Sequence, residues 1–216
     1  MMKYFRTPAD PVLPGSVFSE ARFPGMHTGN HTAVILTGPE EIFSGFNLGN
    51  ISSSRIQFVA TEYQPGAVTH RHSHPEKQIY FIIAGQAAIT VNGQESMLAA
   101  GGVVFIPGGV PHGFVNVGQT PLQLLDIHSY EFDGVANQLG IAAVTYGAGG
   151  RTKLHSHDDR EEIYYVVSGQ ASVTVGDEQA ILGPRGLAFI PKGTAHGYHN
   201  TGSEPVHVLV VSSYDL

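Results

Sequence analysis

The chain has 216 residues, of which 42% are apolar and 13% charged, so it can form one large domain or two compact domains of about 100 residues each. Its formal net charge is −7 and its 11 Lys and Arg are thinly spread, which argues against a nucleic-acid partner. The absence of cysteine excludes disulfides, thiolate metal sites and cysteine nucleophiles. The 27 glycines and 13 prolines favour short strands and many turns, and so predict an all-β fold.

The N-terminal segment shows no targeting or membrane signal. Residues Met1 to Arg6 are not followed by the apolar region of a signal peptide, and no apolar run approaches the 18 residues typical of a membrane helix. We therefore expect a cytoplasmic protein with no membrane partner. Within the segment, Thr32–Thr37 and Glu41–Phe46 have the composition of strands.

Short strands follow in the next part of the chain. They are rich in β-branched and aromatic residues, and they are expected at Ile56–Tyr63, Ile79–Ile83, Ala87–Val91 and Val103–Ile106. Asn92-Gly93 stands between two of them and predicts a two-residue hairpin turn.

The same pattern then recurs, which indicates a duplication. Residues 78–87 reappear as residues 162–171, and Phe105-Ile106-Pro107 reappears as Phe189-Ile190-Pro191. Gly176-Asp177 takes the place of the first hairpin turn. We therefore predict an N-terminal domain over residues 1–133 and a C-terminal domain over residues 134–216. Residues 1–50 have no counterpart in the second copy, and we expect residues of about 30–47 to add strands to the second barrel, which otherwise lacks material to close its sheet.

Three histidines and one amide in the first copy have the pattern of a metal site. His72 and His74 are two residues apart on a predicted strand, so both side chains project from one face. His112 follows a Pro-x-Gly turn and provides a third imidazole, and Gln78 provides an oxygen donor. His70 forms a competing pair with His72, although the spacing to the flanking glycines favours His72 and His74. The equivalent residues of the second copy are His155, His157, His196 and Glu162.

These spacings resemble the two motifs of the cupin superfamily over roughly residues 55–213. The first motif is matched by Gly66, His72, His74, Gln78 and Gly85, and again by Gly149, His155, His157, Glu162 and Gly169. The second motif is matched by Gly101, Pro107, Gly109, His112 and Asn116, and again by Pro191, Gly193, His196 and Asn200, with its glycine displaced by one position to Gly186.

The resemblance implies two tandem jelly-roll barrels, also called double-stranded β-helices, and one divalent transition metal (Fe, Mn, Ni, Co, Cu or Zn) in each. It also implies a homodimer. Gln78 departs from the glutamate of the family motif. A neutral amide binds a divalent ion more weakly and offers no general base, so an empty first barrel kept for folding or dimerisation is the alternative there.

Other residues are candidates for substrate contacts. Lys153 and Arg151 share the expected inward face of His155, where they either hold a substrate anion or lie solvated at the barrel mouth. Tyr164 and Tyr198 are expected to face the interior, where core packing competes with a hydrogen bond to substrate.

The remaining acids and histidines near the motifs receive no role from the pattern. Glu76 and Glu161 border the ligand turns and are expected to face water. Surface or packing positions are expected for His27, His31, His128, His199 and His207.

Three function classes fit this sequence. The first is a metal-dependent dioxygenase of a small enolic, aromatic or keto-acid-like substrate, resembling quercetinase and β-diketone-cleaving cupins, with Glu162 as ligand and proton acceptor. The second is a non-redox isomerase, decarboxylase or lyase of a small organic acid, resembling the bicupin of bacilysin synthesis. The third is a non-catalytic metal or small-molecule binding protein. The dioxygenase is preferred because Glu162, together with the small apolar barrel, favours oxygen chemistry at the second site.

Overall fold

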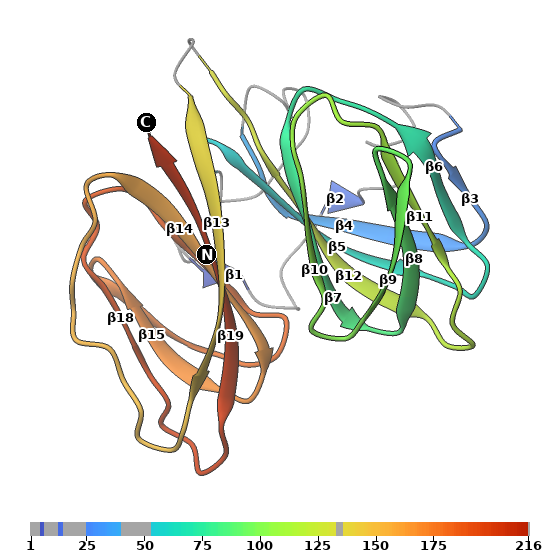
Figure 1. The fold of residues 1–216 in the computed structure, drawn as a ribbon. Helices are drawn as coiled ribbons and strands as arrows, with labels where there is room; N and C mark the ends of the chain where they lie inside the picture. The colour runs from blue at the N-terminus through green and yellow to red at the C-terminus, as the bar shows by residue number, and fades with distance from the viewer. Residues whose placement is uncertain (1–4, 7–12, 15–24, 40–52, 133–135, 216) are drawn as a thin grey trace. The chain divides into compact units, whose positions relative to one another are not determined.

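The computed structural model describes residues 5–6, 13–14, 25–39, 53–132 and 136–215, and these residues form strands and turns with no helix (Figure 1). None of the described residues therefore belongs to a helix that could cross a membrane. The predicted all-β class is confirmed. The strands are β1 (Phe5–Arg6), β2 (Leu13–Pro14), β3 (His27–Thr28), β4 (His31–Thr37), β5 (Ile56–Tyr63), β6 (Val68–His72), β7 (Lys77–Ala84), β8 (Gln86–Val91), β9 (Gln94–Ala99), β10 (Val103–Ile106), β11 (His112–Asn116), β12 (Leu122–Ser129), β13 (Asn137–Tyr146), β14 (Arg160–Ser168), β15 (Ala171–Val175), β16 (Glu178–Leu182), β17 (Leu187–Ile190), β18 (His196–His199) and β19 (Val206–Asp215).

The chain divides into two compact units. The N-terminal barrel comprises residues 12–37 and 56–130, and the C-terminal barrel comprises residues 1–11, 38–55 and 131–216. The boundary predicted after residue 133 falls among residues 133–135, which lie outside the described residues, and it stays a prediction. Both units consist of antiparallel sheets, so the predicted pair of tandem jelly rolls is confirmed.

The N-terminal barrel has two sheets. One has the strand order β10-β7-β12-β5-β4-β2 and the other has the order β3-β6-β11-β8-β9. The alternation of apolar and polar residues turns one face of each sheet inward, and the apolar side chains meet in a core that includes Tyr80, Ile82 and Phe114. Asn92 and Gly93 join β8 to β9 with φ angles of 49° and 79°. Positive φ at both positions is the geometry of a type I′ hairpin turn, as the Asn-Gly pair predicts.

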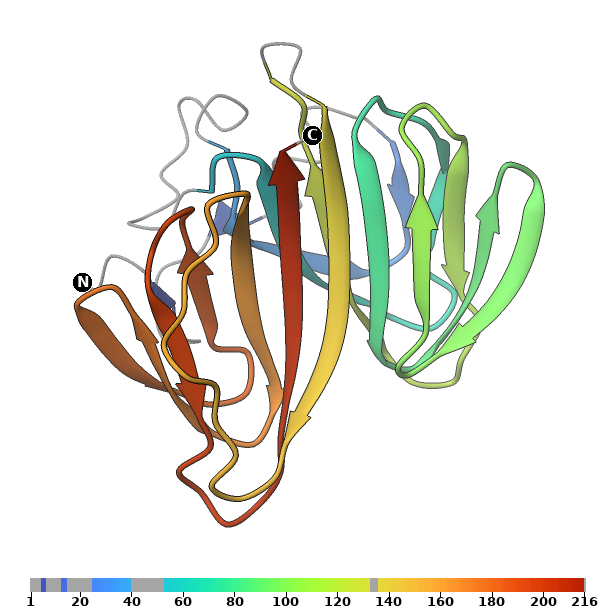
Figure 2. The same ribbon diagram turned by 60° about the vertical axis from the view of Figure 1, so that its left-hand side comes forward.

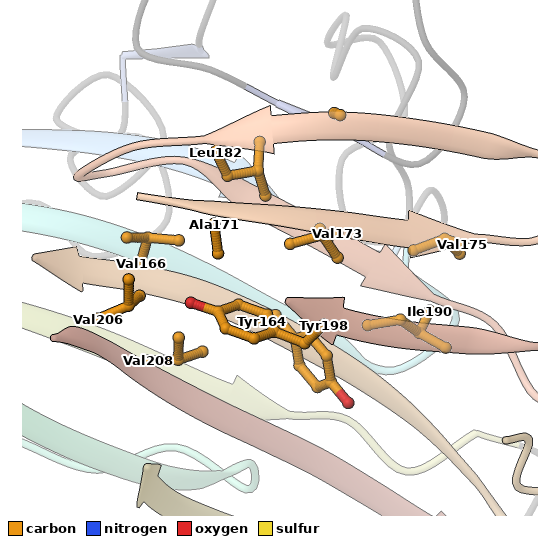
Figure 3. Close-up of a cluster of buried hydrophobic side chains, with 12 residues drawn as sticks. Tyr164, Val166, Ala171, Val173, Val175, Leu182, Ile190, Tyr198, Val206 and Val208 are labelled. Atoms are coloured by element: carbon orange, nitrogen blue, oxygen red, sulfur yellow. The ribbon is translucent and has the colours of Figure 1, made fainter. Parts of the chain in front are cut away.

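The C-terminal barrel repeats this architecture, with fewer strands among the residues that the structure describes. Its sheets have the orders β1-β17-β14-β19-β13 and β16-β15-β18. The long strands β14, β19 and β13 pair along their length and run side by side in orange, red and yellow in Figure 2. Valines and two tyrosines, Tyr164 and Tyr198, fill the interior (Figure 3).

Two residues of the repeated motif have structural roles that explain their recurrence. Gly85 and Gly169 have φ angles of 84° and 81°, and a Cβ at either position would lie within 2.8 Å of a neighbouring backbone atom. Only glycine fits there without displacing the chain. The side-chain amides of Asn116 and Asn200 donate to the carbonyls of Tyr63 and Tyr146 and so tie two strands together inside each barrel.

The N-terminal segment corrects one prediction. Strand β4 pairs with β5, so Thr32–Thr37 extends a sheet of the N-terminal barrel and not of the C-terminal one, because β5 offers it a free edge to hydrogen-bond. Glu41–Phe46 lies outside the described residues. The C-terminal barrel instead receives β1, which pairs with β17 through Phe5 and Arg6.

Candidate metal centres

Three histidines of the N-terminal barrel converge. One ring nitrogen from each of His72, His74 and His112 lies within 4.8 Å of the others, and the ring centroids of His72 and His112 are 4.3 Å apart. His72 ends β6 and His112 begins β11, directly opposite it in register. The prediction that His74 also lies on the strand is wrong, because β6 ends at His72 and Pro75, which lacks an amide hydrogen, follows His74. The turn brings His74 to the cluster.

The tautomers of the cluster follow from backbone contacts. The Nδ1 atoms of His72 and His112 lie 2.8 Å from the carbonyl oxygens of His70 and Val110. A carbonyl can only accept, so each Nδ1 carries the hydrogen and each Nε2 carries a lone pair. Among the described residues, the buried Nε2 of His112 has no hydrogen-bond partner. Neutral imidazoles aimed at one point through Nε2 are what a divalent transition metal requires.

Gln78 faces the cluster from β7. Its Oε1 lies 3.2 Å from Nε2 of His74, and its Nε2 donates to Oδ1 of Asp126 on β12 at 2.6 Å. The carboxylate of Asp126 therefore orients the amide so that its oxygen points toward the histidines. Enclosure of Asp126 in the barrel raises the pKa of its carboxyl, and the hydrogen bond from Gln78 and the nearby histidines lower that pKa by a smaller amount.

A second carboxylate supports His74. The Oε2 atom of Glu76 lies 3.0 Å from Nδ1 of His74, and both side chains are less than a tenth exposed. The expectation that Glu76 faces water is therefore wrong, because the imidazole takes the place of water as its partner. The ring of His128 lies 5.0 Å from the ring of His74 and packs against the cluster from β12.

A cavity of about 50 Å³ adjoins this cluster inside the barrel. Both polar and apolar side chains line it, and the apolar ones include residues of β4, β5, β11 and β12. The polar ones include His72, His74, Gln78, Asp126 and His128. The space suits a small molecule whose polar end meets the histidines.

The C-terminal barrel has the equivalent cluster of His155, His157 and His196. One ring nitrogen from each lies within 4.8 Å of the others. Nδ1 of His155 contacts the carbonyl of Lys153 and Nδ1 of His196 contacts that of Thr194, both at 2.9 Å, so the tautomers match those of the first cluster. His155 forms an isolated bridge with His196 and is not part of a regular strand, contrary to prediction, because residues 152–154 and 156–157 make no ladder.

Glu162 lies at the same cluster on β14. Its Oε2 lies 3.2 Å from Nε2 of His196, and its Oε1 accepts hydrogen bonds from Nε of Arg160 at 2.9 Å and from Oγ of Ser212 at 3.0 Å. Burial alone would raise the pKa of this carboxyl, but the contacts with His196, Arg160 and Ser212 outweigh it and lower the pKa to about 2. Glu162 is therefore an ionised oxygen donor and a poor proton acceptor.

The predicted substrate-contact residues lie in two different environments. Lys153 and Arg151 are exposed, and the backbone of Arg151 forms an isolated bridge with His199. Tyr164 and Tyr198 belong to the apolar core, with 7% and 2% exposure (Figure 3). The hydroxyl of Tyr198 is buried and has no hydrogen-bond partner among the described residues. A substrate role for these four residues stays a prediction.

The sequence analysis did not identify Asp126 and Arg160 at the clusters, and it did not predict that Glu76 is buried beside one of them. Asp126 was detectable in principle. It interrupts the apolar run Leu122–Ile127 at the position where the second copy has Val210. A charge inside a strand that its repeat keeps apolar indicates a local role.

Comparison with known proteins agrees with this architecture. The sequence model of the cupin domain family matches the chain twice, at residues 59–128 and 142–212. An uncharacterized protein of Streptomyces coelicolor is 39% identical over 75 residues, which cover 35% of this chain and 68% of that protein. The crystal structure of AerE from Microcystis aeruginosa is similar over the whole of both chains, with a TM-score of 0.70 and 15% identity. The oxalate decarboxylase of Lactobacillus farciminis, solved as a formate complex, is similar over 100% of this chain and 89% of its own, with a TM-score of 0.73 and 16% identity.

Proposed function

The chain belongs to the cupin domain family, and we propose that it is a metal-dependent enzyme that moves a proton on a small organic acid without net oxidation. The reaction class is an isomerase, decarboxylase or lyase. One observation carries the proposal: Asp126 lines the same cavity as His72 and His74 of the N-terminal cluster. The oxalate decarboxylase among the similar structures catalyses a reaction of this class by its name, which is in keeping with the proposal.

The donor sets assign one divalent ion to each barrel. His72, His74, His112 and Gln78 would hold it in the N-terminal barrel, and the second set comprises His155, His157, His196 and Glu162. The lone pairs directed at one point by the Nδ1 contacts fit an ion of the Fe, Mn, Ni, Co, Cu or Zn group. When bound, the metal would act as a Lewis acid toward a substrate oxygen.

Asp126 is the proposed proton carrier. Its raised pKa brings the carboxyl closer to neutral pH, where a general acid–base group is most effective. Gln78 holds Oδ1, so the group stays oriented when it gains or loses a proton. In an isomerisation Asp126 would take a proton from one carbon and return it to another. In a decarboxylation carbon dioxide would leave and Asp126 would supply the proton that replaces it.

Apolar side chains in the lining of the cavity restrict the substrate. Ile35, Val59, Phe114 and Leu124 line it together with the polar groups. They displace water from around Asp126 and the histidines, which strengthens electrostatic interactions at the site. A small molecule with one polar end and a short carbon skeleton fits this division.

A dioxygenase acting at the C-terminal barrel is the second candidate. The observation in its favour is Glu162, an ionised carboxylate beside three histidines, because three imidazoles and a carboxylate suit redox-active metals. Its low pKa gives Glu162 the role of a ligand in this proposal and not that of the proton acceptor expected from the sequence.

The test uses untagged protein loaded with each metal in turn. Small 2-oxo and dicarboxylic acids are incubated with it in deuterated water, and deuterium incorporation, carbon dioxide release and oxygen uptake are recorded. We expect incorporation or release without oxygen uptake. Asp126→Asn should lower the rate by roughly 10²-fold or more, since general acid–base catalysis contributes about 10²–10⁴.

Metal content is measured on the same samples. Asp126→Asn that keeps its metal but loses the reaction supports the proton role. The matched variant Asp177→Asn changes an acid in the C-terminal hairpin turn and should leave the rate unchanged. Oxygen consumption that depends on Glu162 and not on Asp126 would favour the dioxygenase instead.

A further inference from the structure

The side chains next to the two histidine clusters have opposite charges at equivalent positions of the repeat. Gln78 and Glu162 are equivalent, and two residues before them stand Glu76 and Arg160. Each of these two side chains touches the second histidine of its own cluster. Both copies therefore have a charged side chain in contact with the second histidine, but that side chain is negative in the first copy and positive in the second.

In the N-terminal barrel the charge beside the cluster is negative. Glu76 lies 3.0 Å from Nδ1 of His74, on the side of the ring away from Gln78. A carboxylate in this position makes the imidazole a stronger donor to a metal. Asp126 adds a second acidic group directly behind the amide of Gln78. Both acids attract a cation to the cluster.

In the C-terminal barrel the charge beside the cluster is positive. Nη2 of Arg160 lies 2.8 Å from Nε2 of His157, and Nε of Arg160 lies 2.9 Å from Oε1 of Glu162. The guanidinium stays protonated and lies over the ring of Tyr214, with 5.0 Å between Cζ and the ring centroid. One cation thus contacts two of the proposed ligands, and it both occupies their lone pairs and repels a second cation.

We propose that this charge inversion sets the order of metal loading: the N-terminal site binds a divalent ion first, and Arg160 holds the C-terminal site at lower affinity. The inference rests on the metal sites of the proposed function. Glu162 gives the second site a carboxylate that the first site lacks. The inference predicts that the second site nevertheless binds metal more weakly, because Arg160 already neutralises the charge of Glu162. The two centres would then differ in occupancy whenever metal is scarce.

The experiment is a titration of untagged, metal-free, full-length protein with Mn(II), followed by calorimetry and by the electron paramagnetic resonance of free Mn(II). We expect a tight phase and a weaker phase. His112→Ala should remove the tight phase, and His196→Ala should remove the weaker one. Arg160→Gln should tighten the weaker phase and Glu76→Gln should weaken the tight phase, each by roughly 10–100-fold, the usual effect of residues that orient metal ligands.

Two further variants separate charge from folding. Arg160→Lys keeps the charge and should leave the weaker phase closer to wild type than Arg160→Gln does. Arg185→Gln removes the same charge from an exposed position of the same barrel and should change neither phase. Two equal phases, loss of the tight phase in His196→Ala, or equal effects of Arg160→Gln and Arg185→Gln would overturn the inference while leaving the metal sites intact. Absence of any Mn(II) binding would overturn both.

Discussion

Gln78 and Asp126 together take the place of a single glutamate. In the C-terminal barrel Glu162 brings its negative charge to the cluster directly, whereas in the N-terminal barrel the charge stands one side chain farther away, on Asp126. The amide of Gln78, which lies between Asp126 and the histidines, is oriented by Asp126 but carries no charge itself. The pKa of the Asp126 carboxyl is raised, whereas the contacts with His196, Arg160 and Ser212 lower the pKa of Glu162.

This pairing predicts a strong coupling between the two positions. Gln78→Glu replaces the amide donor by a carboxylate facing Asp126, and we expect the free energy of unfolding of the metal-free protein to fall by about 1–3 kcal/mol. Adding Asp126→Asn restores a donor on the opposite side, so the double variant should recover most of the loss. Denaturant unfolding of the four proteins in a chelating buffer measures the coupling, and additive effects would contradict the pairing.

His27 shows a different use of a histidine, as a neutral, partly buried group. Burial, and then the neighbouring His31, His72 and His70, lower its pKa to about 4. Its Nδ1 lies 3.1 Å from Oγ1 of Thr69 and 3.3 Å from the hydroxyl of Tyr63. The ring of His31 stands 4.4 Å away, so a proton on His27 would face other imidazoles and no carboxylate among these contacts.

A pH dependence of stability follows. An unfolded His27 takes up a proton near pH 6.5, whereas the folded one stays neutral until about pH 4, so the unfolded state binds more protons between these values. Because solvent screens the partly exposed ring, stability should therefore fall by about 1–2 kcal/mol as the pH drops from 6.5 to 4. His27→Gln should flatten this part of the profile and His199→Gln, at an exposed histidine, should not. Parallel profiles for wild type and His27→Gln would contradict the assignment.

At the scale of elements, a carboxylate anchors the segment that precedes β5. The buried Glu161 accepts hydrogen bonds from the hydroxyls of Ser53 and Ser54 and from the amides of Ser54 and Arg55, at 2.7 to 3.1 Å. The prediction that Glu161 faces water is wrong, because residues far upstream in the sequence supply its partners. The segment 53–55 thereby becomes part of the C-terminal barrel.

Removing this charge should loosen the C-terminal barrel. Glu161→Gln replaces an acceptor of several hydrogen bonds by an amide with only one acceptor oxygen, and we expect a loss of roughly 1–3 kcal/mol in the free energy of unfolding. Glu204→Gln is the control, because Glu204 is exposed on the same barrel. Thermal unfolding and, in a separate measurement, hydrogen exchange of the folded protein test the prediction. Equal stability of the two variants would contradict the anchoring role.

The sequence predicted those elements whose cause is local. Ile56–Tyr63 and Val103–Ile106 match β5 and β10 in full, because β-branched residues and bounding turns specify each strand without help from the rest of the chain. The histidines of both clusters were located by spacing alone. The partners of Glu161, the position of β4 and the contact of Gln78 with Asp126 depend on which strands become neighbours, and no local pattern contains that information.

At the scale of the whole molecule, the two barrels are interleaved in the sequence. Residues 1–11 and 38–55 belong to the C-terminal barrel although they precede or divide the N-terminal one. Each of the two cupin matches, 59–128 and 142–212, is one continuous stretch of sequence, but each folded unit is assembled from separate stretches. The cytoplasmic location and the homodimer expected from the sequence remain predictions at this scale.

The fragment 134–216 should therefore be a poor substitute for the C-terminal barrel. It lacks β1, which leaves the edge of β17 open, and it lacks Ser53 and Ser54, which leaves Glu161 without these partners. We expect it to aggregate or to unfold without a cooperative transition, as measured by size-exclusion chromatography and circular dichroism. A monomeric fragment that unfolds cooperatively would show that residues 1–11 and 38–55 are dispensable to this barrel.

The pairing of β1 with β17 also has a consequence for synthesis on the ribosome. Phe5 and Arg6 are synthesised roughly 180 residues before their partners Ala188 and Leu187. At about 5–20 residues per second the first strand waits on the order of ten seconds or more for its place in a sheet. During that interval the N-terminal barrel can complete itself, whereas the C-terminal barrel can close only after β17 has been synthesised. A nascent chain stalled before residue 187 would thus carry one finished barrel and an unpaired leading strand, a form that chaperones are suited to bind.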